Sequence, residues 1–337
     1  MQALVISRCS VGLSVTLHIV PKHSRLRAAV IGAGVFGRFH AAKYQGMANV
    51  DLIAVADPSA DARLTAETQL GVRAIADWRK LKGTVDLVSI CSPAVTHAAI
   101  VRGFLEAGAH VLVEKPIATT LEEAEELIHL ASTRGRVLTV GHQERFVFAK
   151  SGLLAREDAP LSIECTRAGP WTGRSTDVGA VLDLMIHDID LVHCLVTHAL
   201  TSVRASGQAV RGAMLDEVTA NLSFANGSEV TLFASRVADT RQRSMRLVYP
   251  DGTIEIDFLT RTMVNTTSRA LLPLELDDPL GQSVTAFVTA VEGGSASLVR
   301  PEEARRALAT ALAIEDAAAL GVGVLKTRAP QGIAVVA

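Results

Sequence analysis

The chain has 337 residues, more than one ordinary hydrophobic core accommodates, so we expect two domains. Hydrophobic residues make up 49% and charged residues 20%, a balance typical of a globular enzyme. The formal net charge is −2 and no block of Lys and Arg stands out, which argues against a nucleic-acid partner. The four cysteines lie far apart without a CxxC pair, which favours a cytoplasmic protein with reduced thiols over a disulfide framework or a zinc site.

Residues 1–25 carry no recognisable motif. The apolar run VGLSVTLHIV at 11–20 contains His18 and is too short to cross a bilayer. It also lacks the basic start and the small-residue cleavage site of a signal peptide. We therefore interpret 1–25 as an N-terminal extension and expect no membrane partner.

The chain from 26 to 145 alternates short apolar runs with helical stretches. The runs are rich in Val, Ile and Leu without strict alternation, which is typical of strands buried on both faces. They are LRAAVI (26–31), VDLIAVAD (50–57), VDLVSICSP (85–93), HVLVEKP (110–116) and RVLTVGH (136–142). This alternation predicts an α/β domain of the Rossmann type, with a doubly wound parallel sheet.

A glycine-rich loop follows the first predicted strand. Gly32, Gly34 and Gly37 have the G-x-G-x-x-G spacing and open a predicted helix, and Asp57 stands at the end of the second strand. This context is the dinucleotide-binding fingerprint, in which the loop cradles the cofactor diphosphate and the carboxylate binds the adenosine ribose. Because Asp57 would repel a 2′-phosphate, we predict NAD rather than NADP. The predicted cofactor-binding residues of this half are Gly32, Gly34, Val35, Phe36, Gly37 and Asp57.

The chain from 146 to 337 has a different pattern. Two alternating stretches, 216–235 and 246–258, contain Asn-Gly and Asp-Gly at their centres, which is a strong hairpin signal. Helices are expected near 178–197, 279–292 and 301–320. We predict an α+β domain with an open, mostly antiparallel sheet.

Polar side chains interrupt the apolar helix VLDLMIHDID at 181–190. Residues four apart share a helical face, which puts Asp183 and His187 together, with Asp190 close to the same stripe. A solvated stripe on an amphipathic helix is the simplest explanation. A divalent metal site is another alternative, but no second histidine clearly joins this face, so we predict no metal.

The order of motifs adds context to these residues. After the fingerprint come EAGAHVLVEKP, GHQERF and VLDLMIHDIDLV, and together they resemble the Gfo/Idh/MocA oxidoreductases, the family of glucose–fructose oxidoreductase and inositol dehydrogenase. The resemblance covers the chain from about Arg27 onward. It implies NAD(P)-linked hydride transfer involving a sugar, polyol or related carbonyl. It also implies that the domain at 146–337 binds substrate and that its open sheet packs in oligomers, as a homodimer or homotetramer. GHQERF with DLMIHDID is similar to the nucleotide-sugar branch, the UDP-N-acetylglucosamine 3-dehydrogenase-like members.

The resemblance also assigns site residues. Lys115 corresponds to the EKP lysine beside the nicotinamide ribose, and Asp183 and His187 to the D-x-x-x-H pair. CSPAVTH matches the segment that lines the nicotinamide. The implied cofactor residues are Ser92, Pro93, His97, Glu114 and Lys115. Leu184 and Met185 replace the small residues of many members, which would narrow the pocket.

The expected chemistry is oxidation of an alcohol. We expect His187 to act as the base, Asp183 to orient its ring, and Lys115 to stabilise the developing alkoxide, although either Lys115 or His187 could take the proton. Asp190 would hold the other side of His187 or bind substrate. Arg145, Trp171 and Arg174 are expected to grip a phosphorylated or acidic substrate.

Two further functions compete with a dehydrogenase. An NAD-assisted glycoside hydrolase would turn over without added NAD. A regulator that only binds dinucleotide would have no need of Lys115, Asp183 and His187 together.

Overall fold

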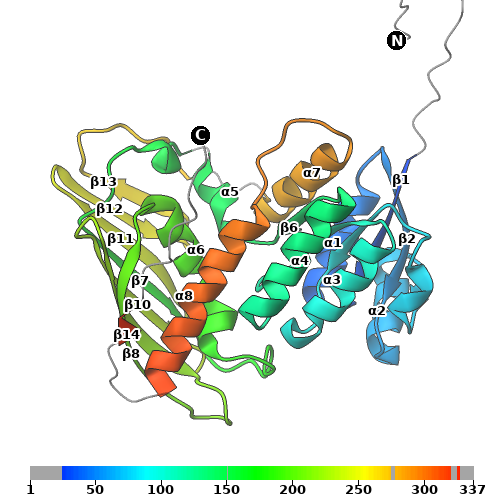
Figure 1. Cartoon of the computed structure of the whole chain (residues 1–337), viewed down its shortest axis with the longest axis horizontal. Helices are drawn as coiled ribbons and strands as arrows, with labels where there is room; N and C mark the ends of the chain where they lie inside the picture. The colour runs from blue at the N-terminus through cyan, green and yellow to red at the C-terminus, as the bar shows by residue number, and fades with distance from the viewer. Residues whose placement is uncertain (1–24, 150, 275–277, 320–324, 327–337) are drawn as a thin grey trace, which may run out of the picture.

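Two β-sheets organise the chain (Figure 1). The computed structural model describes residues 25–149, 151–274, 278–319 and 325–326, so the N-terminal extension expected at 1–25 lies outside the described residues except for Arg25. No helix of the described residues is both long and apolar enough to cross a membrane.

The first sheet has six parallel strands in the order β3-β2-β1-β4-β5-β6. Its strands are β1 (Leu26–Ile31), β2 (Val50–Ala56), β3 (Ala74–Ile75), β4 (Leu87–Ile90), β5 (His110–Val113) and β6 (Leu138–Val140), and its helices are α1 (Val35–Gln45), α2 (Ala60–Leu70), α3 (His97–Glu106) and α4 (Leu121–Arg134). All five predicted strands are present, and the sequence analysis missed only the two-residue β3. The strand order reverses between β1 and β4, which is where such sheets bind ligands.

The second sheet is mostly antiparallel, as predicted, with one parallel neighbour pair, β7–β10, among its described strands. Its order is β13-β12-β11-β7-β10-β9-β8-β14. The strands are β7 (Ser162–Ala168), β8 (Leu200–Gln208), β9 (Glu217–Phe224), β10 (Glu229–Ser235), β11 (Gln242–Tyr249), β12 (Gly252–Asp257), β13 (Thr262–Asn265) and β14 (Leu325–Lys326). Both predicted hairpins form, and Gly227 supplies the positive φ of +86° that the β9–β10 turn requires.

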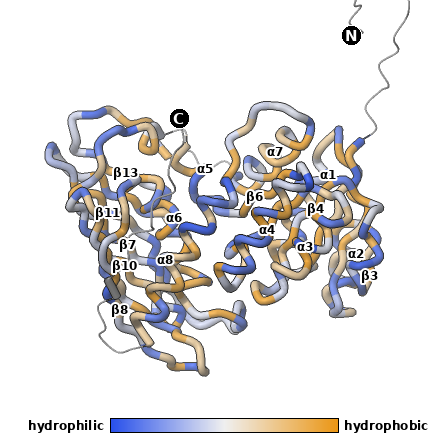
Figure 2. The backbone as a smooth tube through the Cα atoms, in the orientation of Figure 1, coloured by the Kyte–Doolittle hydropathy of each residue, from blue (hydrophilic) through white to orange (hydrophobic). Residues whose placement is uncertain are grey.

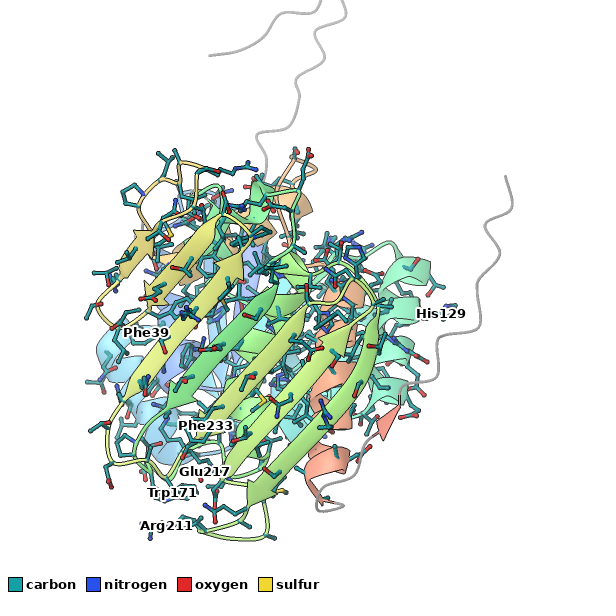
Figure 3. The ribbon with its side chains drawn as sticks, turned by 90° about the vertical axis from the view of Figure 1, so that its left-hand side faces the viewer. Phe39, His129, Trp171, Arg211, Glu217 and Phe233 are labelled. Carbon is teal, nitrogen blue, oxygen red and sulfur yellow. The ribbon has the colours of Figure 1, made fainter. Side chains whose placement is uncertain are left out.

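Helices cover one face of this sheet. They are α5 (Glu144–Ala149), α6 (Ile186–Leu195) and α8 (Pro301–Ala319), with a π-helical turn at Val181–Met185 before α6. The described chain also contains α7 (Pro279–Val291) and 3-10 turns at Trp78–Leu81, Ala94–Thr96 and Leu153–Ala155. Figure 1 shows α6 and α8 against the side of the sheet that faces the first sheet. No described helix covers the opposite side, and Figure 3 looks onto this face, with Glu217 and Phe233 among its outward side chains.

Helix α7 returns to the first sheet, although the predicted boundaries assign it to the second domain. It packs beside α1, and its Val284 and Phe287 are fully buried in one cluster with Val30 and Tyr44. Hydrophobic residues cover much of α7 in Figure 2. By packing, the first domain is therefore built from two separate parts of the chain.

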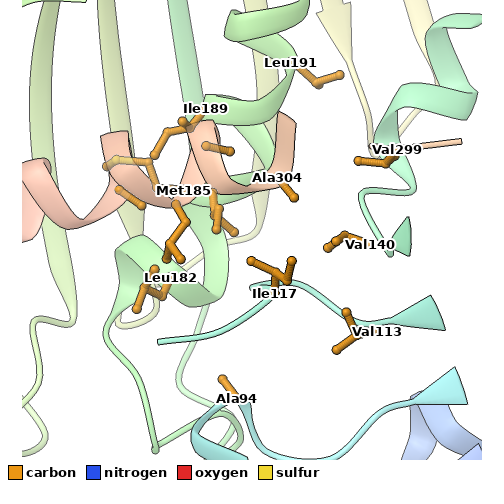
Figure 4. Close-up of a cluster of buried hydrophobic side chains, with 14 of the residues drawn as sticks. Ala94, Val113, Ile117, Val140, Leu182, Met185, Ile189, Leu191, Val299 and Ala304 are labelled. Carbon is orange, nitrogen blue, oxygen red and sulfur yellow. The ribbon is translucent and has the colours of Figure 1, made fainter. Parts of the chain in front are cut away.

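An apolar cluster joins the carboxyl ends of the first sheet to the π-helical turn (Figure 4). Leu182 and Met185 of the turn lie close to Ile117, which follows β5, and to Ala94, which follows β4. Met185 is fully buried here, so it does not narrow the pocket as expected from the sequence, whereas Leu184 does line the pocket. This packing holds the backbone next to Lys115 against the backbone next to Asp183.

Candidate active site

A cavity of about 890 Å³ lies at the carboxyl ends of β1, β4 and β5 and extends to the second sheet. Its walls include Gly34, Ser92, Lys115, Asp183 and His187. The volume falls in the usual range for small-molecule sites. The cavity therefore brings together residues that the sequence analysis assigned separately to cofactor and catalysis.

The glycine loop has the geometry of a dinucleotide site. Gly32 has φ +97°, and a Cβ on Gly37 would lie 1.7 Å from the Gly32 carbonyl oxygen, so both positions require glycine. A Cβ on Gly34 would meet nothing within 4 Å, and Gly34 caps α1 without a side-chain hydrogen bond. The first N–H groups of α1 thus face open space, which suits an anionic diphosphate. Val35 and Phe36 line the pocket beside them.

Asp57 lies at the base of this loop rather than on the pocket wall. Its Oδ2 accepts a hydrogen bond from Ala33 N at 2.7 Å and its Oδ1 accepts one from Ser59 N at 2.8 Å. Arg63, the nearest arginine in the sequence, donates to the carbonyls of Asp57 and Pro58, both at 2.9 Å. The Asp57 carboxyl group therefore lies near the expected ribose position without an arginine ion pair in the described chain.

Glu114 lines the pocket and is fixed there by a partly buried network. Its Oε1 lies 2.9 Å from His40 Nε2 and accepts a hydrogen bond from Gln143 Nε2 at 2.9 Å. Burial raises the pKa of Glu114, but the His40 contact and the charge of Lys115 outweigh it and hold the pKa below its ordinary value. The Glu114 carboxylate packs directly against the backbone of Gly141, where a Cβ would lie 2.8 Å from Glu114 Oε1.

The segment after β4 contains residues that line the pocket and a buried histidine that holds the backbone behind them. Ser92 and Pro93 line the pocket, whereas His97 is buried behind them and does not. The ring nitrogens of His97 lie 2.7 Å from the Pro116 carbonyl oxygen and 2.9 Å from the Ser92 carbonyl oxygen. His97 thus connects the backbones that follow β4 and β5 instead of facing the cofactor, which differs from the sequence expectation.

Lys115 and Asp183 form a direct pair. Lys115 Nζ donates to the Asp183 carbonyl oxygen at 2.5 Å and lies 3.5 Å from Asp183 Oδ1. No hydrogen bond joins Asp183 to His187 in the described chain, so Asp183 does not orient the imidazole as expected. The π-helical turn explains the difference, because its wider winding changes the side-chain positions assumed for a regular α-helix.

His187 lines the pocket next to this pair. Its Nδ1 is buried and has no hydrogen-bond partner among the described residues. Burial, followed by the positive charges of Lys115 and Arg167, lowers the pKa of His187 well below its ordinary value. The imidazole is therefore neutral near neutral pH and can accept a proton.

The four predicted substrate residues separate into two pairs. Trp171 and Arg174 line the pocket. Arg145 and Asp190 do not: Asp190 is 1% exposed and accepts from Arg145 at 2.6 and 2.7 Å, while Arg145 also donates to Glu303 at 2.5 Å. They connect α5, α6 and α8, so we assign them a structural role. The metal alternative would require Asp183, His187 and Asp190 to meet. They do not, because Asp190 is bound to Arg145 away from the pocket wall.

Further arginines on the wall were missed because β7 was not predicted. Arg167, at the end of β7, is buried and bound to Asp188 at 2.8 and 3.0 Å and to Glu144 at 2.9 Å. Arg241 and Arg243 precede and begin β11. Alternating arginines before a predicted hairpin were the available signal.

Known protein families match both domains of this chain. Residues 26–142 match a family described as an oxidoreductase family with an NAD-binding Rossmann fold, and residues 155–255 match the Gfo/Idh/MocA C-terminal domain. UDP-N-acetylglucosamine 3-dehydrogenase from Acidithiobacillus ferrooxidans is 38% identical over 239 residues, 71% of this chain and 76% of the relative. Inositol 2-dehydrogenase/D-chiro-inositol 3-dehydrogenase from Halalkalibacterium halodurans is 33% identical over 193 residues, 54% of this chain and 56% of the relative.

A solved structure of the Acidithiobacillus ferrooxidans enzyme superimposes with a TM-score of 0.80 at 35% identity, covering 87% of this chain and 97% of that one. The predicted family, fold class and NAD cofactor are confirmed. The chain belongs to the Gfo/Idh/MocA family of NAD-binding oxidoreductases.

Proposed function

We propose that this protein is an NAD-dependent dehydrogenase that oxidises a ring hydroxyl of a nucleotide-activated sugar of the UDP-N-acetylhexosamine class. The observation that carries the reaction type is the meeting of Lys115, Asp183 and His187 on one wall of the pocket that the glycine loop opens. The similarity to UDP-N-acetylglucosamine 3-dehydrogenase supports the substrate class.

The chain's own residues divide the work as follows. The N–H groups at the start of α1 hold the cofactor diphosphate and Asp57 holds the ribose, while bound NAD supplies the hydride acceptor. Neutral His187 takes the proton from the substrate hydroxyl as the carbon loses its hydride and becomes a carbonyl. Lys115, held by Asp183, places its positive charge against the oxygen on which negative charge develops.

The contacts favour His187 over Lys115 as the proton acceptor. Lys115 Nζ donates a hydrogen bond to the Asp183 carbonyl oxygen and lies 3.5 Å from Asp183 Oδ1, so it acts as a hydrogen-bond donor within this pair. His187 Nδ1 has no hydrogen-bond partner among the described residues, and burial followed by the charges of Lys115 and Arg167 lowers the pKa of His187, which favours its neutral form. A base must begin the reaction without its proton, and His187 meets this condition.

The alternatives from the sequence make different demands. A regulator that only binds dinucleotide has no use for a lysine paired with an aspartate beside a buried neutral histidine. A glycoside hydrolase would release the aglycone without net reduction of added NAD.

We also propose that the uncovered face of the second sheet forms the homo-oligomer and that the protein is cytoplasmic, as its free thiols Cys91, Cys165 and Cys194 suggest.

The function is tested with a set of UDP-sugars and the corresponding free sugars, incubated with NAD while the absorbance of the reduced cofactor is followed. We expect reduction with a UDP-N-acetylhexosamine and a loss of kcat of about 10² or more in His187→Gln and Lys115→Met. His129→Gln, at an exposed site on α4, is the matched control and should keep the wild-type rate (Figure 3). Turnover that releases sugar without reducing NAD, or full activity in His187→Gln, would contradict the proposal.

A further inference from the structure

Three arginines on the second-domain wall of the pocket have no partners in the part of the chain that the structure describes. Arg174 lies on the loop after β7, and Arg241 and Arg243 lie at the start of β11; all three line the pocket and are exposed. None of their guanidinium groups takes part in an ion pair or side-chain hydrogen bond with a described residue. The two segments adjoin, because a Cβ on Gly169 would lie 3.3 Å from Arg241 Cγ.

The strand register places Arg243 beside another positive charge. Arg243 stands directly opposite Arg167 in the β11–β7 ladder, and like charges at such positions repel. Arg167 is neutralised by Asp188 and Glu144, whereas no described carboxylate forms an ion pair with Arg243. A positive charge is therefore kept on the pocket wall against a neighbouring positive charge, with its counter-charge missing from the described chain.

The loop that carries Arg174 is tethered rather than loose. Arg236 donates to the carbonyls of Ser175 at 3.0 Å and Val178 at 2.8 Å, and its Nε donates to Asp216 at 2.6 Å. The Arg236 guanidinium also lies 5.1 Å from the Trp171 ring centroid. These contacts fix the loop to the end of β10, and the β11–β7 ladder fixes the backbone at Arg243 and beside Arg241, so the arginine backbones are largely set before any ligand binds.

We propose that Arg174, Arg241 and Arg243 form a clamp for the diphosphate of a nucleotide sugar, an inference that rests on the proposed function and names the part of the substrate that these residues bind. Guanidinium groups bind phosphate oxygens through two parallel hydrogen bonds, and a diphosphate offers several such oxygens. A free sugar or polyol is neutral and would leave three positive charges unmatched.

The diphosphate of the cofactor is the other source of the same chemistry. It has its own binding site at the start of α1, where Gly34 leaves open space at the N-terminus of a helix. The clamp residues come from β11 and the loop after β7, which belong to the second domain. The two sources are therefore separated by measuring UDP and NADH binding independently.

The test is calorimetric titration of UDP, and separately of NADH, into wild type, Arg174→Gln and the double variant R241Q/R243Q. We expect each variant to bind UDP at least about tenfold more weakly, because charged hydrogen bonds are lost, and to bind NADH as wild type does. Arg246→Gln is the matched control, because Arg246 lies on the same strand and is paired with Glu255 and Glu164. Its UDP affinity should not change.

Several results would overturn the clamp. These are absence of UDP binding to wild type, equal UDP affinity in wild type and variants, or a parallel loss of NADH affinity, which would assign the arginines to the cofactor. If wild type oxidises a UDP-sugar and the variants keep its KM, the clamp is wrong and the proposed function stands. If UDP binding depends on the arginines but no UDP-sugar reduces NAD, the clamp stands and the proposed function is wrong. Melting temperatures verify that the variants are folded.

Discussion

His193 should make the stability of this protein depend on pH. Its side chain lies between α6 and α8, 4% exposed, with Nε2 2.8 Å from Thr310 Oγ1 and its ring edge-on to Phe224. Burial, with a smaller contribution from the Arg306 charge, lowers its pKa to about 3. In the unfolded chain the same imidazole titrates near its ordinary pKa of about 6.5.

The sign and size of the effect follow from this difference. Between pH 6.5 and pH 3 the unfolded chain binds a proton that folded His193 does not, so the free energy of unfolding falls as the pH is lowered. One pKa unit corresponds to about 1.4 kcal/mol, so the full effect approaches about 5 kcal/mol and the loss between pH 7 and pH 5 is about 2 kcal/mol. The loss at pH 5 barely changes if the folded pKa is one unit higher or lower, because the folded residue remains neutral there.

The assay compares wild type with His193→Gln in urea unfolding at pH 7 and pH 5. Glutamine can keep a hydrogen bond to Thr310 but cannot titrate. Between pH 7 and pH 5 the free energy of unfolding of wild type should therefore fall by about 2 kcal/mol more than that of His193→Gln. His142 and His187 are also buried and contribute the same background in both proteins. Parallel losses of stability in wild type and His193→Gln would refute the reasoning, whereas exposed His129→Gln should follow wild type.

Three further outcomes test the site. Asp183→Asn should lower kcat by about 10² while leaving the fold intact, because it weakens the hold on Lys115; an unchanged kcat would show that the Asp183 carbonyl alone holds the lysine. Asp57→Ala should reduce the preference for NADH over NADPH in parallel titrations, since the repelling charge is removed, and tighter NADPH binding by wild type would contradict the cofactor assignment. The kcat/KM for oxidation should begin to fall only below pH 6.5, because the pKa of His187 in the free enzyme is lowered; a fall that begins above pH 7 would exclude His187 as the base.

The first domain could be predicted closely from the sequence because its signals are local. The five predicted strands from 26 to 142 are mostly apolar runs, and the glycine spacing fixes the loop between β1 and α1. The hairpins around Asn226 and Asp251 could equally be predicted, since a short turn determines the pairing of its own strands. The position of α7 could not be read in this way, because its apolar face suits either domain and only the folded chain places it beside α1.

Only part of the site could be predicted, because some of its contacts join segments that are distant in the sequence. Lys115, Asp183 and His187 do meet, but the pairing of Asp183 with Lys115 depends on a π-helical turn that an assumed α-helix does not contain. Arg145 was taken for a substrate residue because its partners Asp190 and Glu303 are far away in the sequence. Ion pairs between distant segments leave no local pattern, so exposed and neutralised arginines look alike until the fold is known.

The charges around His187 connect substrate binding to the chemistry. Lys115, Arg167 and Arg243 all lower its pKa, and only Arg243 has no carboxylate partner in the described chain. A diphosphate held by Arg243 would offset part of this positive field, and the pKa of His187 would then rise toward its ordinary value. A base with a pKa closer to the working pH removes a proton more effectively, so binding of the substrate would make His187 a more effective base. The acid limb of kcat, which reports the enzyme–substrate complex, should therefore lie at higher pH than the acid limb of kcat/KM, and in R241Q/R243Q the separation between the two limbs should become smaller.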